Sequence, residues 1–293
     1  MGKIAIILCN FASISDEAAE RYGITSIESP LSWPEEPQLT GDNIFQKMRD
    51  ALNRGINSFP KTSQPSIGTF KKYFEEALKD NDEVICITIS SKISGTYNAA
   101  LQTKNFLGAS LKDKVHIIDS NNIDVGEGLL GIKAVEVSQE GDTIEKVIEK
   151  IRSYVPKVYF YGMTESPRQM EAGGRIDHVL AAILMQMQKI GMRPILHMAD
   201  GVVKPANLKM NAKNTAEALF RQFEDKNREQ LSKGKCFRVA ISHADNLEEA
   251  DELKLLFETR YPTQSQVDFI NMTGIFIGSH VGPGTLMCCV LED

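Results

Sequence analysis

Hydrophobic positions in the first half of the chain alternate between short apolar runs and longer stretches with helical spacing. The apolar, largely β-branched runs at residues 4–8, 84–89 and 115–118 are typical of parallel strands buried on both faces. Apolar residues recur every three or four positions in the other stretches, which predicts helices at residues 44–54, 69–78, 97–106, 129–137 and 143–154. Strands alternating with helices predict a parallel sheet with right-handed crossovers.

The pattern changes near Pro156, where the last of these helices ends. Strands are predicted beyond it at residues 158–163, 193–198, 237–244 and 284–291, with helices at residues 176–190, 214–224 and 247–257 between them. We therefore predict two α/β domains, residues 1–156 and residues 157–293.

Two segments between the predicted helices and strands are expected to lie at the surface because of their polar composition. Residues 26–40 contain three prolines and are expected to form a surface loop, followed by a helix for which Asp42 is a candidate N-cap. The charged segment at residues 225–235 is expected to be a solvated helix end and turn.

The composition narrows the class of protein. The chain has 293 residues and a formal net charge of −6, which argues against nucleic acid as a partner, because phosphate binding needs a basic face. It has no run of eighteen apolar residues, so no membrane span is expected, and its apolar start is too short for a signal peptide. Five cysteines without CxxC spacing favour reduced thiols in the cytoplasm, and five unclustered histidines make a metal site improbable.

The segment VICITISSKISGTYNAALQTKNF, residues 84–106, is the most informative part of the chain. A predicted strand leads through small hydroxyl residues into a predicted helix, which directs backbone N–H groups and partial positive charge at one place. Such a place is suited to an anion. Ser91 and Ser94 are also explained as N-caps, whereas Gly95 and Thr96 favour binding, because glycine lets a ligand approach the backbone.

Other segments are rich in small polar residues, and each candidate in them has a plain structural alternative. Thr62 in KTSQPSIGTF also suits a turn, and His280 in IGSHVGPGT also suits a loop histidine bonded to backbone. Arg175 in EAGGRI also suits a residue that ties a helix end to nearby carbonyl groups. Asp119 and Ser120 end a predicted strand at the same sheet edge and are weaker candidates.

The segments TSQP, SxxSGTY, GGRI, RPIL…DG and HVGPG follow one another along nearly the whole chain. Together they resemble the DegV family of bacterial fatty-acid-binding proteins. The resemblance implies two α/β domains, the first with a parallel sheet and the second with a mixed or antiparallel sheet. It also implies a long-chain fatty acid in an apolar tunnel between them, with the carboxylate held by Thr62 and Ser94 and with His280 near the head group.

The resemblance further implies a carrier that has no catalytic nucleophile and needs no cofactor. It would present the fatty acid to a separate kinase, which makes an acyl-phosphate for phospholipid synthesis. The predicted helix VLAAILMQMQKI would form part of the tunnel wall, where flexible Met185 and Met187 side chains adapt to different tails, or it would merely pack on a sheet.

Two positions depart from the family pattern. Family members usually have Asp-Ser-Thr after the first strand, where this chain has Cys9, Asn10 and Phe11. Phe11 is expected either to intrude on the cavity or to cap it. The family tends to carry an arginine after RPIL…DG, where this chain has Met210 with Lys209 beside it, which weakens the expectation of a kinase partner more than that of fatty-acid binding.

Two other classes of function remain open. Ser94 as nucleophile and His280 as base would make an acyl hydrolase or transferase, although the chain has no GxSxG elbow and no acidic residue obviously placed to orient His280. A phosphate-binding enzyme is a variant of this hypothesis, although GxxxxGK[ST] is absent. The third class is an interaction module with a vestigial cavity.

Overall fold

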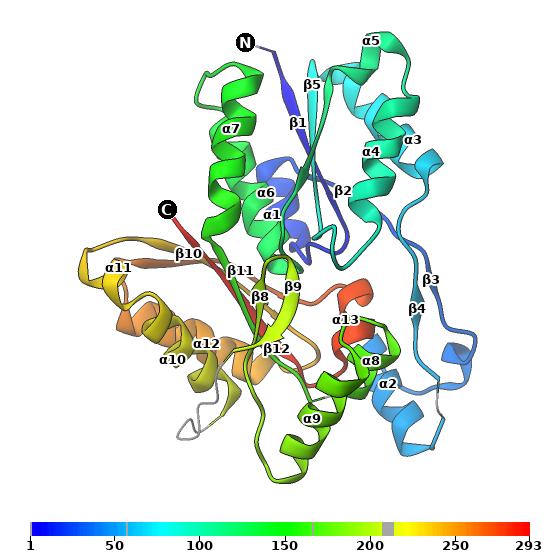
Figure 1. Ribbon diagram of the computed structural model, residues 1–293, viewed down its shortest axis with the longest axis vertical. Coiled ribbons are helices and arrows are strands. Elements are labelled where there is room, and N and C mark those ends of the chain that lie inside the picture. The colour runs from blue at the N-terminus through cyan, green and yellow to red at the C-terminus, as the bar shows by residue number, and fades with distance from the viewer. Residues whose placement is uncertain (1, 57, 166, 207–213) are drawn as a thin grey trace.

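The computed structural model describes residues 2–56, 58–165, 167–206 and 214–293, which form two large sheets and a third of only two strands (Figure 1). The first sheet has the order β2-β1-β5-β6 and all its neighbouring strands are parallel. Its strands are β1 (Ile4–Cys9), β2 (Thr25–Ile27), β5 (Glu83–Thr88) and β6 (Val115–Asp119). The predicted parallel sheet of the first half is therefore confirmed.

Helices of the first half connect these strands or, in the case of the last two, lead from β6 to the second sheet. They are α1 (Asp16–Tyr22), α3 (Ile67–Asp80), α4 (Thr96–Phe106), α5 (Ala109–Lys112), α6 (Val125–Ser138) and α7 (Ile144–Tyr154). Helix α6 is buried along nearly its whole length and contacts β1 and β5 of the first sheet as well as β7, β10 and β12 of the second. Its glycines permit this close packing, since a Cβ on Gly128 would lie 2.9 Å from the Ala12 carbonyl oxygen.

The second sheet has the order β11-β10-β12-β7-β8-β9 and is mixed, because only β10 and β11 pair in parallel. Its strands are β7 (Val158–Met163), β8 (Leu196–Ala199), β9 (Val202–Pro205), β10 (Phe237–His243), β11 (Ser265–Met272) and β12 (Leu286–Glu292). Helices α10 (Thr215–Lys226) and α12 (Leu247–Arg260) pack on one face of it, and the short α11 (Arg228–Ser232) follows α10.

The two sheets divide the chain where the pattern of hydrophobic positions changes. The first sheet ends before Pro156 and the second begins at Val158. One hydrophobic core nevertheless contains residues of both sheets, including Ile85 on β5 and Cys289 on β12. The boundary between two separate domains at residue 156 therefore stays a prediction.

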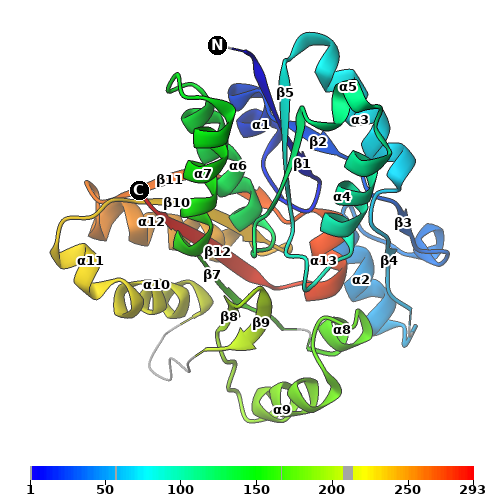
Figure 2. The same cartoon turned by 45° about the horizontal axis from the view of Figure 1, so that its top comes forward.

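A long excursion from the first sheet reaches the second half of the chain. It contains β3 (Leu31–Ser32), the 3-10 helix η1 (Glu36–Gln38), α2 (Ile44–Asn53) and β4 (Lys61–Thr62), and β3 pairs with β4. The Asn43 side chain donates to Asp245 at 3.0 Å, and Phe45 packs on Gly278, where a Cβ would lie 2.4 Å from the phenyl ring. Figures 1 and 2 show α2 close to α13 (Ile275–Val281).

Several local predictions were wrong. Asn43, rather than Asp42, caps α2, because the Asn43 side-chain oxygen accepts from the backbone N–H groups of Phe45 and Gln46. Residues 26–40 are not a simple loop, since they contain β3 and η1. Helix α8 (Pro167–Ala172) precedes α9 (His178–Lys189), and α1, α8, β9, β11 and α13 were not predicted.

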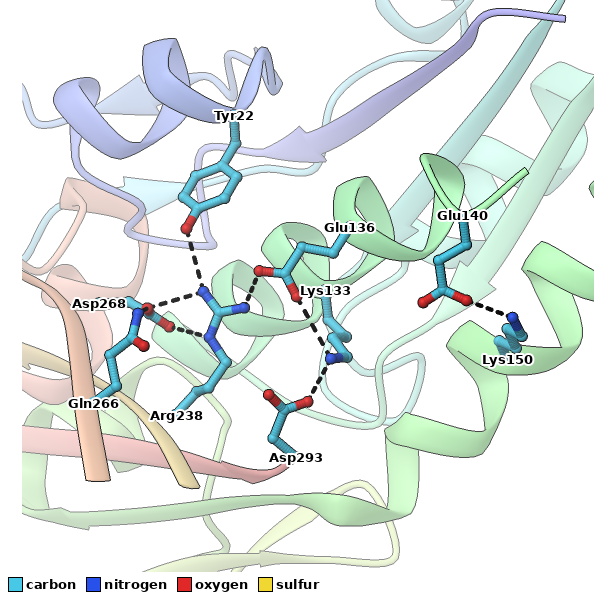
Figure 3. A network of polar contacts seen from close by, with 9 residues as sticks. All are labelled: Tyr22, Lys133, Glu136, Glu140, Lys150, Arg238, Gln266, Asp268 and Asp293. Carbon is cyan, nitrogen blue, oxygen red and sulfur yellow. Dashed lines mark hydrogen bonds and ion pairs between the residues drawn. The ribbon is translucent and has the colours of Figure 1, made fainter. Parts of the chain in front are cut away.

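A buried ionic network ties α6 to the second sheet (Figure 3). Arg238 on β10 is 6 % exposed and donates to both oxygens of the Asp268 carboxylate at 2.8 and 2.9 Å. It also donates to Glu136 on α6 and to the Tyr22 hydroxyl. Burial opposes the charge, but Asp268 and Glu136 outweigh it and raise the pKa of Arg238.

The described residues include neither a membrane-spanning helix nor a cluster of metal ligands. None of the helices within these residues is long and apolar enough to cross a membrane. The same residues contain no group of three or more histidine, cysteine or acidic side chains placed to hold a metal ion. All five cysteines are free thiols, and only Cys236 is exposed.

Candidate ligand-binding site

A cavity of about 590 Å³ opens where the excursion meets the second half of the chain. Its walls come from β4 and the residues before it, from α8 and the turn after it, and from α13. The lining residues are Glu35, Ser58, Phe59, Pro60, Lys61, Thr62, Gln169, Ala172, Gly173, Arg175, Ser279 and His280. Three segments far apart in the sequence, each with one of the predicted motifs, therefore meet here together with Glu35.

Thr62 and His280 are joined directly, because the Thr62 hydroxyl and His280 Nε2 lie 2.9 Å apart. His280 lies within helix α13, so the alternative of a loop histidine does not hold. His280 is 8 % exposed, and burial, followed by the charge of Arg175, lowers its pKa to about 4. The imidazole is therefore neutral at pH 7. A protonated Nε2 would donate to Thr62 and free the threonine hydroxyl to donate to an anion.

The GGRI segment borders the same imidazole. Gly173 permits the close approach, since a Cβ there would lie 2.2 Å from His280 Nδ1. The Arg175 guanidinium donates to the Gly173 carbonyl oxygen and lines the cavity. Burial lowers the pKa of Arg175, yet arginine keeps its charge in proteins, so the cavity contains a partly buried cation.

Ser94 lies beside the TSQP segment but does not line this cavity. Its hydroxyl hydrogen-bonds with that of Thr96 at 2.8 Å, and the N-cap position of α4 is Gly95 rather than Ser94. The Gln64 side chain lies over Gly95, where a Cβ would be 2.1 Å from Gln64 Oε1. The two segments are therefore adjacent, although no hydrogen bond joins Ser94 to Thr62 or His280 among the described residues.

The weaker candidates at the end of β6 have structural partners. The Asp119 carboxylate accepts from the backbone N–H of Ser91 at 3.2 Å and from that of Asn121 at 2.9 Å. Ser120 is fully buried and its hydroxyl hydrogen-bonds with the Asn122 backbone. Asp119 also lines a second cavity, of about 590 Å³, together with Tyr97, Arg152 and Gly201. These residues do not line the His280 cavity.

Phe11 is fully buried and supports the helix that contains His280. Its ring centroid lies 3.8 Å from that of Phe276 on α13, and Phe276 in turn meets the His280 ring edge-on at 5.8 Å. Phe11 is not a lining residue of the His280 cavity. Lys209 and Met210, the other departure from the family pattern, lie outside the described residues.

The sequence did not single out Gln169, which lies one helical turn before Gly173. Gln169 lines the cavity and is 3 % exposed. Within the described part of the chain, neither its amide nitrogen nor its amide oxygen has a hydrogen-bond partner. In the sequence, only the position of a polar residue one turn before the glycine pair could have indicated Gln169. That pattern is too common to identify a site residue unless the cavity is known.

A family model described as "Uncharacterised protein, DegV family" matches residues 3–293. The chain belongs to the DegV family. The resemblance expected from the five segments is therefore confirmed, as is the mixed α/β fold with one parallel and one mixed sheet.

DegV-family relatives include proteins with described ligands. A protein of Thermotoga maritima named "Fatty acid-binding protein" is 31 % identical over 297 residues, covering 97 % of this chain and 96 % of its own. The crystal structure of DegV from Bacillus subtilis, described as a fatty acid binding protein, is 26 % identical, with a TM-score of 0.79 and all of both chains covered. A DegV lipid binding protein from Thermotoga maritima has a TM-score of 0.77 at 26 % identity, covering 99 % of this chain and 98 % of that one.

Proposed function

We propose that this DegV-family chain is a carrier that binds one long-chain fatty acid, with the carboxylate at the Thr62–His280 cavity and with Ser94 as a further contact. The observation that carries the proposal is the hydrogen bond between Thr62 and the neutral His280 beside the Arg175 cation. Hydroxyl donors and a nearby positive charge suit a carboxylate. Relatives at 31 % and 26 % identity are described as fatty-acid-binding proteins, which supports the choice of ligand.

The tail would supply most of the binding free energy. A C16 chain buries about fourteen methylenes, at about 0.8 kcal/mol each, or on the order of 11 kcal/mol. Two or three charge-assisted hydrogen bonds add roughly 3–9 kcal/mol before ordering costs. The head-group site would therefore set the polarity of the bound acid, and an apolar tunnel between the two halves of the chain would set its affinity.

A carrier needs a partner that uses its cargo. We include in the proposal a separate fatty-acid kinase that phosphorylates the presented carboxylate for phospholipid synthesis in the cytoplasm. The cavity is partly open to solvent, which would leave the head group within reach of such a partner. Co-purification with a kinase, or acyl-phosphate formation only when both proteins are present, tests this part.

The alternative, a serine-dependent acyl hydrolase or transferase, has less support. His280 Nε2 pairs with Thr62, and the Ser94 hydroxyl pairs with Thr96. A general base must reach the hydroxyl proton that it removes, and these pairings engage both groups elsewhere. Ester hydrolysis that is lost in Ser94→Ala would restore the enzymatic hypothesis.

Native mass spectrometry of the purified protein, followed by organic extraction and lipid identification, tests the binding proposal. About one fatty acid per chain is expected. The delipidated protein should also take up palmitate or oleate, with a clear preference over the methyl esters. A protein that is purified empty and takes up neither acid contradicts the proposal.

A further inference from the structure

Gln169 is the one residue of the cavity wall with a fully buried side-chain amide that has no partner among the residues the structure describes. Buried side-chain polar atoms are nearly always hydrogen-bonded, and an exception calls for a specific explanation. Leaving an amide buried without a partner lowers the stability of the folded state. A glutamine in such a position is therefore better explained by a group that arrives from outside the chain.

Gln169 lies close to the imidazole of His280, with Gly173 between them. Its backbone carbonyl accepts from the Gly173 N–H at 2.9 Å, which closes the last turn of α8. Gly173 is the residue against which the His280 ring packs. Helices α8 and α13 are in contact (Figure 2). Gln169 and His280 therefore line the same cavity from two neighbouring helices.

We propose that Gln169 is a head-group residue whose amide nitrogen donates a hydrogen bond to a carboxylate oxygen of the bound acid. This inference rests on the proposed function, since it assigns one more contact to the same ligand. Thr62 would donate to the carboxylate from β4, and Gln169 would donate from α8 on another wall. The amide is buried in this structure, so the Gln169 side chain would turn toward the cavity when the acid binds. Its amide oxygen would then accept from a water molecule, for which a cavity of about 590 Å³ has room.

A neutral amide donor has a definite consequence for selectivity. A hydrogen bond to a charged acceptor contributes more than one to a neutral acceptor. Loss of the Gln169 donor should therefore weaken binding of the acid more than binding of its methyl ester. A residue that only packs against the chain would affect the two ligands equally.

The test is a titration of delipidated wild-type protein and variants with palmitate and with methyl palmitate. Gln169→Met keeps the length of the side chain and removes the amide, and should weaken palmitate binding by about 10- to 100-fold, with a smaller change for the ester. The thermal midpoint of this variant without ligand should be unchanged or higher, because an unpaired buried amide has been removed. Gln169→Glu should weaken palmitate binding further, and acidification of the sample should partly restore it.

A matched control is Gln222→Met, since Gln222 is a fully buried glutamine on α10 that does not line the cavity. It should leave the ratio of palmitate to methyl palmitate affinity unchanged. Equal losses for both ligands in Gln169→Met, or wild-type palmitate affinity in both Gln169 variants, would overturn the inference while leaving the proposed function intact. Failure of the wild-type protein to bind palmitate would overturn both.

Discussion

Two buried polar regions of this molecule are built in opposite ways. Around Arg238, both carboxylate oxygens of Asp268 are engaged, and the guanidinium also reaches Glu136 and Tyr22 (Figure 3). In the His280 cavity, the amide of Gln169 has no partner among the described residues. The first region satisfies its polar groups within the chain, whereas the second leaves a donor and an acceptor unused.

This difference separates a structural role from a binding role. The Arg238 network joins α6 and β11 to β10, so its hydrogen bonds stabilise the packing of the helix on the second sheet. In the His280 cavity, polar groups from three segments face a shared open space. Substitutions in the first region should change stability, and substitutions in the second should change ligand binding.

Loss of the Arg238 side chain should have the largest effect on stability. Arg238→Ala leaves the Asp268 carboxylate, whose side chain is 2 % exposed, without its cationic partner. Removal of one partner of a buried ion pair costs about 3–5 kcal/mol. Urea denaturation should show this loss in the free energy of unfolding. Arg228→Ala removes an exposed ion pair with Asp225 and serves as the control, with little expected change. A loss below about 1 kcal/mol for Arg238→Ala would contradict the structural role.

The neutral state of His280 predicts a dependence of stability on pH. Its pKa is about 4 in the folded protein, below its ordinary value, so the unfolded chain binds more protons between these two pH values. The contribution of His280 to stability should therefore be lost as pH falls from about 6.5 to about 4, by up to about 3 kcal/mol.

The measurement is the difference in unfolding free energy between the wild type and His280→Asn across this pH range. Comparing the two proteins removes the contribution of Glu127, which both contain. Burial raises the pKa of Glu127, so that carboxyl group stabilises the folded state as pH falls, opposite to His280. Parallel pH profiles for the two proteins would show that the imidazole is not held in its neutral form.

Substitutions of the two hydroxyl residues should affect ligand binding with the fold intact. Thr62→Val and Ser94→Ala should each weaken fatty-acid binding by roughly 1–3 kcal/mol, because each removes a donor to the carboxylate. Thr103→Val is a matched control, since the buried Thr103 hydroxyl bonds to the Ala99 carbonyl within α4. Isothermal titration with palmitate would measure the effect. Wild-type affinity in Ser94→Ala alone would confine the carboxylate site to the cavity that Thr62 lines.

The sequence predicted those strands and helices whose hydrophobic pattern alone identifies them. Strand β7 (Val158–Met163) was predicted at its observed residues, and β5 within one residue at each end, because central strands are continuous apolar runs. Helix α13 was not predicted, because its sequence contains Gly278 and lies between Gly274 and Gly282, and the packing of Phe45 on Gly278 is a contact between segments far apart in the chain.

The candidate site was predictable only in part, because it too depends on contacts between segments far apart in the chain. The motifs indicated Thr62, Arg175 and His280, which the structure places on one cavity. Their order along the chain carried no information on the excursion that brings β4 to α13. The role of Gln169 depends on which of its atoms lack partners, and that property exists only in the folded molecule.

Substitution of Phe11 should have the smallest effect of these substitutions. It tests whether this residue acts on stability, as in the Arg238 region, or on ligand binding, as in the His280 cavity. The Phe11 ring packs on Phe276 of α13, and Phe11 is not among the residues that line the cavity. Phe11→Leu should lower the free energy of unfolding by about 1 kcal/mol, the contribution typical of an aromatic pair. Because Phe11 does not line the cavity, the ratio of affinities for C16 and C18 acids should stay at its wild-type value. A shift of that ratio toward the longer acid would show instead that Phe11 limits the space for the tail, and that the departure from the family's Asp-Ser-Thr segment acts on chain length.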